Sequence, residues 1–249
     1  MDRSISVFLP AYNEEENIRD IILEANEYLK PRFHDYEILV VSCASTDRTN
    51  QITLELTKGI PQLRLIAKDT NTGYAGTLRT GFLSATKELI FYTDGDRQYN
   101  IRELDKLLPL LVDYDIVTGY KIKRSDPVMR LWMSKLYNIV MRLLFVPSLK
   151  VGDVNCAFKL YKREVIDRVI FLPNITQGVI NTEIYVSAIK NGYKIGEVSV
   201  SHYARTKGNA EAEMGPRGKF FAFVRPIIIW RFLKDTFYLW RKVHARIRE

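Results

Sequence analysis

The sequence predicts an α/β domain with a largely parallel sheet. Apolar runs of strand length alternate with runs of helical periodicity from the first residues on, and no internal repeat or low-complexity linker interrupts them. The chain has 249 residues, of which 47% are hydrophobic and 27% are charged, so it can bury a sizeable core. This composition excludes disordered and collagen-like chains.

The first half of the chain holds the clearest elements. Residues 5–9 are an apolar run ended by Pro10, which predicts a strand. Asn13 is predicted to cap a helix that has glutamates in its first turn, at 14–16, and apolar residues at helical spacing as far as Leu29. Similar patterns predict the elements that follow, namely strands at 37–41 and 63–67 and helices at 46–56 and 75–85.

The later elements follow from the same patterns. Residues 89–93 predict a strand that ends in a polar cluster, and a stripe of leucines over 104–111 predicts one helix. Strands are predicted at 115–119 and 195–200. In open α/β sheets, ligands bind beyond the carboxyl ends of the strands, so candidate functional residues should directly follow strands.

Two aspartates follow the strand predicted at 89–93. Asp94 and Asp96 are separated by Gly95, which permits a tight turn. Carboxylates at this spacing can hold a hard divalent cation against a diphosphate. The same residue types are common in solvated turns, so this motif alone leaves both interpretations open.

Several enzyme classes lack their motifs in this chain. No glycine-rich loop ends in Gly-Lys-Ser or Gly-Lys-Thr, the glycines at 73 and 76 do not have the dinucleotide-binding spacing, and no Gly-x-Ser-x-Gly elbow occurs. Kinases, nicotinamide-dependent enzymes and α/β-hydrolases are therefore not expected. Two cysteines and three histidines cannot form a disulfide framework or a Cys/His zinc site.

Residues 214–249 differ from the rest of the chain in charge. They hold nine basic and two acidic residues, so seven of the eight net positive charges lie there. We therefore divide the chain into a domain at 1–213 and a basic helical tail at 214–249. A membrane-spanning helix needs roughly 18 uninterrupted apolar residues. Arg225, Arg231 and Lys234 break the most apolar part of the tail, so no such span is expected.

A helix predicted from Pro226 onward is amphipathic. Its apolar face would be Ile229, Phe232, Leu233, Thr236, Trp240 and Val243, and its mostly basic face Arg231, Lys234, Asp235, Tyr238, Arg241 and Lys242. Such a helix can lie in an anionic membrane interface, and residues 128–145 offer a second apolar surface. The alternative is a helix docked on the domain. Nucleic-acid binding is not expected, because the aromatic residues are not interleaved with the charges.

Four motifs occur in the order found in family 2 glycosyltransferases. They are Pro10-Ala11-Tyr12-Asn13-Glu14, Ser45-Thr46-Asp47, Asn71-Thr72-Gly73-Tyr74 and Asp94-Gly95-Asp96-Arg97-Gln98. The second half resembles the subgroup similar to dolichol-phosphate mannose synthase. That resemblance rests on the residues from Gly119 to Asp126, Arg130, Ser134, Cys156-Ala157-Phe158-Lys159-Leu160, Glu183 and the residues from His202 to Gly208. Together these motifs cover about residues 4–210.

The resemblance implies a GT-A fold and a transferase that inverts the sugar carbon. The donor would be a nucleotide-diphosphate sugar and the acceptor a polyprenyl phosphate, dolichyl or undecaprenyl. The residues that line the nucleoside pocket would be Pro10, Tyr12 and Glu14. Those that hold Mg²⁺ or Mn²⁺ would be Asp94, Asp96 and Gln98. Phosphate contacts would come from Lys121, Arg130, Ser134 and Arg205, and the residues expected to carry catalysis are Asp96, Arg130 and Arg205.

This chemistry does not depend on a general base. An acceptor phosphate is already anionic near neutral pH, so its attack needs positioning and charge neutralisation. The family usually has Arg at the position of Lys121, and Lys cannot bind a phosphate in the same bidentate way.

The chain departs from the family pattern after its second strand. Where the family has Asp-Asp-Gly-Ser, this chain reads Ser42-Cys43-Ala44-Ser45, so the acids that help read the base and ribose are absent and the donor stays undetermined. Cys43 is expected to be a small, partly buried residue rather than a reactive thiol. Asp47 is expected to be an acid at the start of the next helix. Asn155 stands where the near subgroup often has Asp.

Two other positions and two alternative functions stay open. His202 either approaches the diphosphate or caps the last strand, and Glu183 belongs either to the site or to a helix start. The functional alternatives are a weakly active homologue acting as a membrane-associated binding subunit, and a transferase with a glycan hydroxyl acceptor. The sequence shows no signal-peptide pattern, and we expect a cytoplasmic location, peripheral to a membrane.

Overall fold

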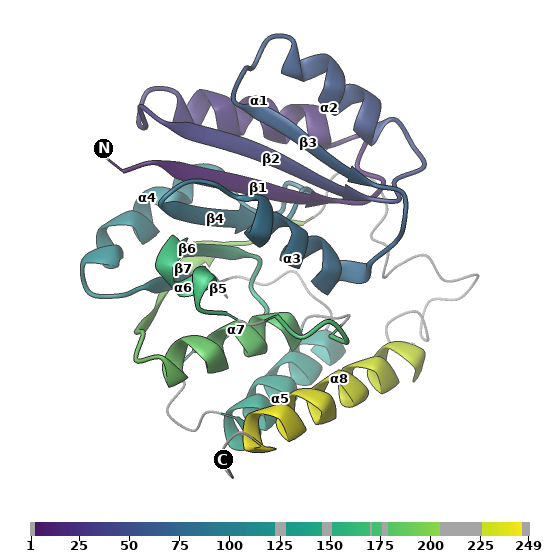
Figure 1. Ribbon diagram of the computed structural model, residues 1–249, viewed down its shortest axis with the longest axis vertical. Coiled ribbons are helices and arrows are strands. Elements are labelled where there is room, and N and C mark those ends of the chain that lie inside the picture. Colours follow the sequence, from purple (N-terminus) through teal and green to yellow (C-terminus); the bar gives the residue numbers. More distant parts are fainter. Residues whose placement is uncertain are drawn as a thin grey trace.

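A seven-stranded sheet runs through the molecule (Figure 1). The computed structural model describes residues 3–122, 128–145, 151–169, 171–175, 179–204 and 226–245, and gives the backbone alone at 128–131, 133, 134, 226–229 and 245. The strands lie in the order β3-β2-β1-β4-β6-β5-β7. Four of their six pairings are parallel, which confirms the predicted α/β class.

The first four strands form the parallel half of the sheet. They are β1 (Ile5–Ala11), β2 (Tyr36–Cys43), β3 (Leu63–Lys68) and β4 (Leu89–Thr93). Every residue of β2 and of β4 is buried, because both strands have neighbours on either side and helices over the sheet. This explains why these strands have continuous apolar runs rather than an alternating pattern.

Three helices connect the parallel strands. They are α1 (Ile18–Leu29), α2 (Thr49–Thr57) and α3 (Gly73–Ser84). Since the chain moves from β1 to β2 to β3 and then returns to β4, right-handed connections place α1 and α2 on one face and α3 on the other. At Gly81 a Cβ atom would lie 2.4 Å from the Phe8 ring, so α3 can approach the sheet closely only with glycine there.

Helix α1 begins later than predicted. Asn13 is not its cap: the residue has a φ of 54°, and its Oδ1 accepts a hydrogen bond from the Thr46 amide at 2.8 Å. The helix begins at Ile18, after a turn in which the amides of Asn17 and Ile18 both bond to the Glu14 carbonyl. A partner 33 residues away therefore determines the conformation of Asn13.

The leucine stripe at 104–111 does not form one helix. It is divided into the 3₁₀ turn η1 (Ile101–Glu103), α4 (Leu104–Leu107) and the 3₁₀ turn η2 (Leu108–Val112). Pro109 lies in the first turn of η2 and has no amide hydrogen to continue the α-helical pattern. The predicted apolar residues are nevertheless buried, at Leu104, Leu107, Leu108 and Leu111.

The second half of the sheet contains a strand that the sequence did not predict. Strand β6 (Phe158–Lys162) lies antiparallel between β4 and β5 (Ile116–Ile122), and β7 (Ile195–Ser201) pairs with β5. Lys159 lies fully buried in β6, where its ammonium donates to Thr118 Oγ1, the Val154 carbonyl and the Tyr185 hydroxyl at 3.0, 3.0 and 2.6 Å. Burial lowers the pKa of Lys159 to about 8.

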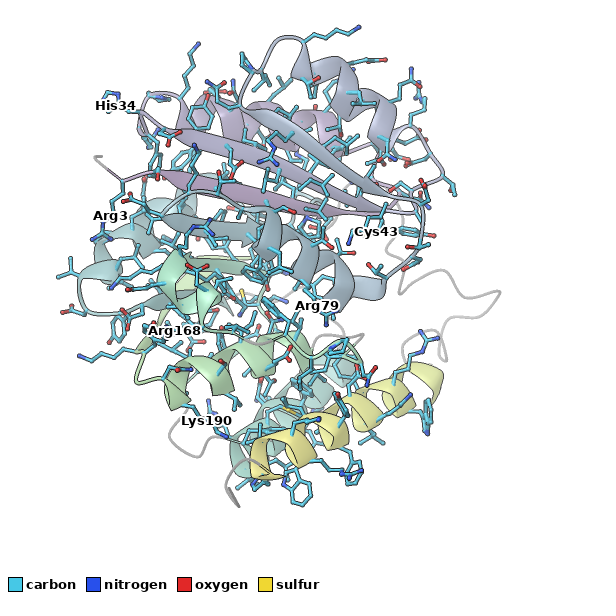
Figure 2. All side chains as sticks on the ribbon, viewed as in Figure 1. Arg3, His34, Cys43, Arg79, Arg168 and Lys190 are labelled. Atoms are coloured by element: carbon cyan, nitrogen blue, oxygen red, sulfur yellow. The ribbon has the colours of Figure 1, made fainter. Side chains whose placement is uncertain are left out.

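The remaining helices follow β5 in the chain. They are α5 (Val128–Leu144), α6 (Arg163–Asp167), α7 (Val179–Lys190) and α8 (Pro226–Ala245). Figure 1 shows α5 beside α8, with α7 between this pair and the sheet. The Lys190 ammonium, at the end of α7 labelled in Figure 2, donates to the Val243 carbonyl at 3.1 Å.

The faces of the tail helix differ from the prediction. Asp235, assigned to the basic face, is buried, whereas Leu233 and Trp240, assigned to the apolar face, are exposed. The buried side is formed by Asp235, Thr236, Leu239 and Val243. Helix α8 therefore docks through one side and presents a separate row of apolar and aromatic residues to solvent.

Candidate functional site

The parallel strand order changes direction between β1 and β4, and the candidate site lies at this point. β1 leads outward to β2 and β3, whereas β4 pairs with the opposite edge of β1. In open α/β sheets, ligands bind at the carboxyl ends of the strands where the order reverses in this way. A Cβ atom on Gly95 would lie 3.1 Å from the Pro10 carbonyl oxygen. This contact brings the Asp94–Asp96 turn against the end of β1.

Among the residues that the structure describes, three other than glycine have left-handed backbone conformations, and all of them lie close to the ends of adjacent strands. Asn13 follows β1, Ala44 follows β2 and Arg97 lies beyond β4, with φ values of 54°, 58° and 60°. Such conformations are costly for residues with a Cβ, and they concentrate at functional sites. Their clustering here is a signal that no sequence motif predicted.

Asp94 and Asp96 occupy the end of β4 and act on each other electrostatically. Burial raises the pKa of Asp94 to about 7, and the charge of Asp96 contributes further in the same direction. Glu14 also raises this pKa, whereas Lys121 lowers it. The structure therefore places three of the predicted carboxylates and one predicted cation within electrostatic range of one another.

The two residues after Asp96 hold this turn in place. Arg97 forms an ion pair with Asp20 at 2.7 Å and a second one with Glu24, both on α1. The backbone amide of Gln98 donates to Asp96 Oδ1 at 3.1 Å, and its side-chain Nε2 donates to the Tyr203 carbonyl at 3.1 Å. The side-chain nitrogen of Gln98 thus binds the segment after β7. The Oε1 atom of the same side chain is the one that could bind a metal.

The predicted nucleoside residues lie on the other wall of the site. Pro10, Tyr12 and Glu14 are half-buried at and after the end of β1. The Glu14 amide donates to Thr49 Oγ1 at 2.8 Å, and its carboxylate accepts from Asn17 Nδ2 at 2.9 Å. These bonds fix the loop that follows β1 against the start of α2.

The end of β2 carries short neutral side chains. Ser42 Oγ donates to Ser45 Oγ at 2.8 Å, and Thr72 Oγ1 lies 3.5 Å from the Cys43 sulfur. Figure 2 places Cys43 at the strand ends, and its side chain is buried, as predicted for a small packed residue. The Asp47 carboxylate accepts hydrogen bonds from the backbone amides of Glu15 and Thr49, at 3.0 and 2.9 Å. It therefore connects the loop after β1 to the start of α2.

The predicted phosphate contacts are only partly described. Lys121 lies near the end of β5, half-buried. Arg130 and Ser134 lie on α5, but their side chains fall outside the described residues, as does Arg205 altogether.

Glu183 and His202, which the sequence left open, lie at different places. The carboxylate of Glu183 is buried and accepts from the Leu172 amide at 2.6 Å. Burial raises its pKa to about 7. The ring of His202 follows β7 and packs edge-on against Tyr99, with ring centroids 5.1 Å apart.

Sequence reasoning did not identify the polar groups below the aspartates. The Tyr74 hydroxyl donates to Asp94 Oδ1 at 3.4 Å. The Tyr92 hydroxyl donates to Asn181 Oδ1 on α7 at 2.9 Å. Tyr92 looked like a core residue of an apolar strand, so no local pattern distinguished it.

The site suits a hard divalent cation that is shared with a ligand. The part of the chain that the structure describes holds no group of three or more His, Cys, Asp or Glu side chains arranged around a metal. Two carboxylates and one amide oxygen, from Asp94, Asp96 and Gln98, would leave half of an octahedral shell to diphosphate oxygens and water. The repulsion that raises the pKa of Asp94 would be relieved by a cation there.

A comparison with models of known protein families shows which family the chain belongs to. The model of glycosyl transferase family 2 matches residues 6–170. The chain belongs to this family. The match confirms the resemblance seen in the motifs, and it contains both Asp94 and Asp96.

Curated relatives of this family 2 chain are sugar transferases that act on polyprenyl phosphates. Dolichyl-phosphate beta-glucosyltransferases of Trichomonas vaginalis and Saccharomyces cerevisiae are 29% and 25% identical to it, each over 79% of the chain. An undecaprenyl-phosphate 4-deoxy-4-formamido-L-arabinose transferase of Yersinia pestis is 24% identical over 84% of the chain. The chain spans 62–66% of the length of these three relatives.

Solved structures confirm a GT-A fold for the family 2 chain. Glucosyl-3-phosphoglycerate synthase of Mycobacterium tuberculosis, in complex with Mn²⁺, uridine diphosphate and phosphoglyceric acid, superposes with a TM-score of 0.66 at 17% identity. That comparison covers 94% of this chain and 78% of the synthase. A complex of the same synthase with Mg²⁺ and uridine diphosphate gives a TM-score of 0.64.

Proposed function

We propose that the chain transfers a sugar, with inversion, from a nucleotide-diphosphate donor to a polyprenyl phosphate at a membrane surface. The observation that carries this proposal is the cluster of Asp94, Asp96, Glu14 and Lys121 around the ends of β1 and β4 in a family 2 chain. The polyprenyl-phosphate relatives support the acceptor class.

The charges of the site suit a diphosphate leaving group. A divalent cation bound by Asp94 and Asp96 would neutralise charge that develops on the departing diphosphate. Glu14 and the end of β1 would enclose the nucleoside, and Lys121 would attract phosphate from the β5 side. In this proposal Arg130, Ser134 and Arg205 supply the other contacts to phosphate.

The side of the site toward α7 supports a phosphate acceptor. On this side the Tyr92 hydroxyl donates to Asn181, and Asn181 donates to Asn155. Both asparagine side chains are neutral amides and cannot remove a proton. Burial raises the pKa of Tyr137, which neighbours Asn155, to about 12, so it stays protonated. A hydroxyl acceptor needs a base, whereas a phosphate is already anionic at neutral pH.

Helices α5 and α8 support action at a membrane surface. Both helices expose large apolar side chains in rows of helical spacing, at Trp132, Leu136, Ile139 and Leu143 on α5 and at Trp230, Leu233, Phe237 and Trp240 on α8. We call these two rows the apolar rows. Exposed basic residues accompany them, at Lys135, Arg231, Lys234, Arg241 and Lys242. This combination suits an anionic lipid surface. Among the described residues, no helix has the length and hydropathy needed to cross a bilayer.

Nucleotide binding provides the first test. Thermal stability would be measured with uridine, guanosine and other nucleoside diphosphates, each with and without Mn²⁺. Because the two aspartates supply few ligands, we expect Mn²⁺ alone to have little effect and one nucleotide to raise the Tm only when Mn²⁺ is present. Asp96→Asn should abolish this rise, whereas Asp113→Asn, on an exposed turn, should preserve it.

Sugar transfer from the stabilising nucleotide to a short polyprenyl phosphate is the second test. We expect Asp96→Asn to lower kcat/KM at least roughly a hundredfold, the scale of losing an electrostatic contact in the transition state. Folded protein that binds no nucleotide under any of these conditions would instead favour a binding subunit. Transfer to a glycan hydroxyl but not to a polyprenyl phosphate would overturn the acceptor assignment.

A further inference from the structure

The residues between α5 and β6 include a buried stretch at 151–156 that forms neither helix nor strand, and we call it the 151–156 segment. Val151, Asp153, Val154 and Cys156 are at most 3% exposed. The backbone amides and carbonyls of such a stretch have no helical or strand partners, and a buried group without a partner destabilises the fold. The segment therefore needs hydrogen-bond partners from elsewhere in the chain.

Helix α5 supplies the first of these partners. The side chain of Asn138, 7% exposed, donates from Nδ2 to the Gly152 carbonyl at 2.9 Å and accepts at Oδ1 from the Val154 amide at 3.2 Å. One carboxamide thus binds a backbone carbonyl and a backbone amide, as a neighbouring strand would. Arg142, one turn further along α5, donates to the Val151 carbonyl.

The sheet holds the same segment. Glu197 on β7 accepts from the Gly152 amide, which lies 2.9 Å from each of its carboxylate oxygens, and from the Asp153 amide at 3.2 Å. The buried ammonium of Lys159 on β6 donates to the Val154 carbonyl at 3.0 Å. Hydrogen bonds to charged groups are stronger than those between neutral groups. The segment therefore connects α5 firmly to β6 and β7.

Two faces of α5 have different compositions. Positions 130, 134, 138 and 142 recur every four residues, so helical spacing places them on one face. The apolar row of α5, from Trp132 to Leu143, falls on the opposite face. Arg130 and Ser134, two of the expected phosphate contacts, thus precede Asn138 by about two turns and one turn on its own face. A movement of Asn138 relative to the segment would displace both of these positions.

The two hydrogen bonds of Asn138 require a side chain with both a donor and an acceptor, which a carboxamide supplies. An ionised aspartate would keep an acceptor for the Val154 amide but would place a second negative oxygen against the Gly152 carbonyl. Leucine is close to asparagine in size and would leave both backbone groups without this partner. Position 138 therefore has a chemical requirement in addition to its packing.

We propose that Asn138 is a positioning residue, which fixes α5 on the 151–156 segment and thereby places the acceptor side of the active site. The inference rests on the proposed function, since it assigns Arg130 and Ser134 to phosphate. In this scheme Asn138 contacts no substrate and acts through the helix that carries it. The donor side, at the ends of β1 and β4, does not depend on it.

Two variants of Asn138 and one control separate positioning from general stability. Asn138→Asp removes the donor to Gly152, and Asn138→Leu removes both hydrogen bonds. Val165→Ala is the control, because it shortens a fully buried side chain on α6, a helix that contributes none of these bonds. We expect all three substitutions to lower the Tm to a similar extent and to preserve the rise in Tm given by nucleotide with Mn²⁺.

Hydrogen–deuterium exchange of the full chain reports on α5 without relying on activity. Peptides that cover 128–145 and 151–158 would be compared with those from β1 to β4. We expect Asn138→Leu to speed exchange in the first two at least roughly fivefold, because α5 and the segment lose their mutual bonds, and to leave β1 to β4 unchanged. Val165→Ala should not alter the α5 peptides. Exchange in α5 that stays at the wild-type rate in both Asn138 variants would overturn the inference.

Kinetics supply the readout that a purely structural role would not change. Asn138→Asp should raise the KM for a short polyprenyl phosphate about tenfold, the scale of one buried hydrogen bond, and keep the donor KM within about twofold of wild type. Val165→Ala should change neither KM. Equal rises in both KM values, or the same acceptor effect in the control, would overturn the positioning role.

The wild type distinguishes failure of this inference from failure of the proposed function. If it transfers no sugar to a polyprenyl phosphate, the proposed function is overturned, and the acceptor role of Asn138 with it. The exchange comparison would still decide whether Asn138 fixes α5 on the segment.

Discussion

The Phe232 ring packs edge-on against the Tyr137 ring, with centroids 5.7 Å apart, and this contact joins α8 to α5. Phe232 is half-buried in that contact, whereas Phe237, five residues further along α8, is exposed. The two phenylalanines of one helix therefore have different roles.

Phe232→Ala should destabilise the protein. The substitution removes half-buried apolar surface and an aromatic pair, so we expect a loss of about 1–3 kcal/mol in the free energy of unfolding. Urea unfolding would measure this loss. Phe237→Ala serves as the control, with a change of less than about 0.5 kcal/mol. Equal losses in both variants would contradict the docking of α8 through Phe232.

Charges placed in the apolar rows should weaken membrane binding. Leu136→Glu and Leu233→Glu each remove an exposed leucine and add a negative charge, so we expect each to lower binding to anionic vesicles at least roughly tenfold. Val112→Glu alters an exposed apolar residue outside these rows and should leave binding unchanged. Vesicle flotation of the full chain is the measurement. Truncating the tail is a poorer test, because it would also uncover the surfaces on which α8 docks.

Binding of the nucleotide with Mn²⁺ should strengthen as the pH rises. A proton and a cation compete for Asp94, whose pKa is raised to about 7 by burial and by Asp96. Affinity should therefore fall by up to tenfold for each pH unit below about 7 and level off above about 8. Calorimetric titrations at a series of pH values from below 7 to above 8 would show both the slope and the plateau. An affinity independent of pH would contradict the shared carboxylate site.

Glu183→Gln should stabilise the protein more at pH 8 than at pH 5. The pKa of Glu183 is raised by burial to about 7, from an ordinary value of 4.5, so the folded state binds more protons between these values. Stability that depends on this proton is present at low pH and is lost as the pH rises toward 7. Glutamine keeps an oxygen to accept from the Leu172 amide and carries no charge.

Thermal unfolding at the two pH values measures this difference, which we expect to reach about 2 kcal/mol at most. Glu164→Gln, an exposed position, is the control and should show the same small change at both pH values. A Glu183→Gln effect that does not change with pH would show that burial of the charge is not what the substitution relieves.

Local sequence determined the parallel half of the fold and the position of the aspartates. The strand Leu89–Thr93 was predicted with its observed bounds, because a buried parallel strand must be apolar throughout. Asp94 and Asp96 follow it directly, so their place at the strand end could be inferred from their neighbours alone. The family motifs are likewise short and contiguous, which is why they identified the family.

Strand β6 shows what local sequence did not determine. From the sequence alone, a lysine such as Lys159 is expected at the surface. A buried ammonium is tolerated only where hydrogen-bond acceptors surround it. Its acceptors come from Thr118, Val154 and Tyr185, and the last two lie on segments outside the sheet. The strand could be recognised only once the fold had brought these groups together.

The same physical reason applies to the groups that surround the site and to the tail helix. Composition and motif determined that this chain carries a carboxylate pair at a strand end and a basic tail. Only the tertiary structure decided that Asn13 takes a left-handed conformation to meet Thr46, that Asp235 turns inward, and that Tyr92 donates to Asn181 on α7. Each of these depends on a partner distant in sequence, and a hydrogen bond or a buried surface exists only when both of its members are in place.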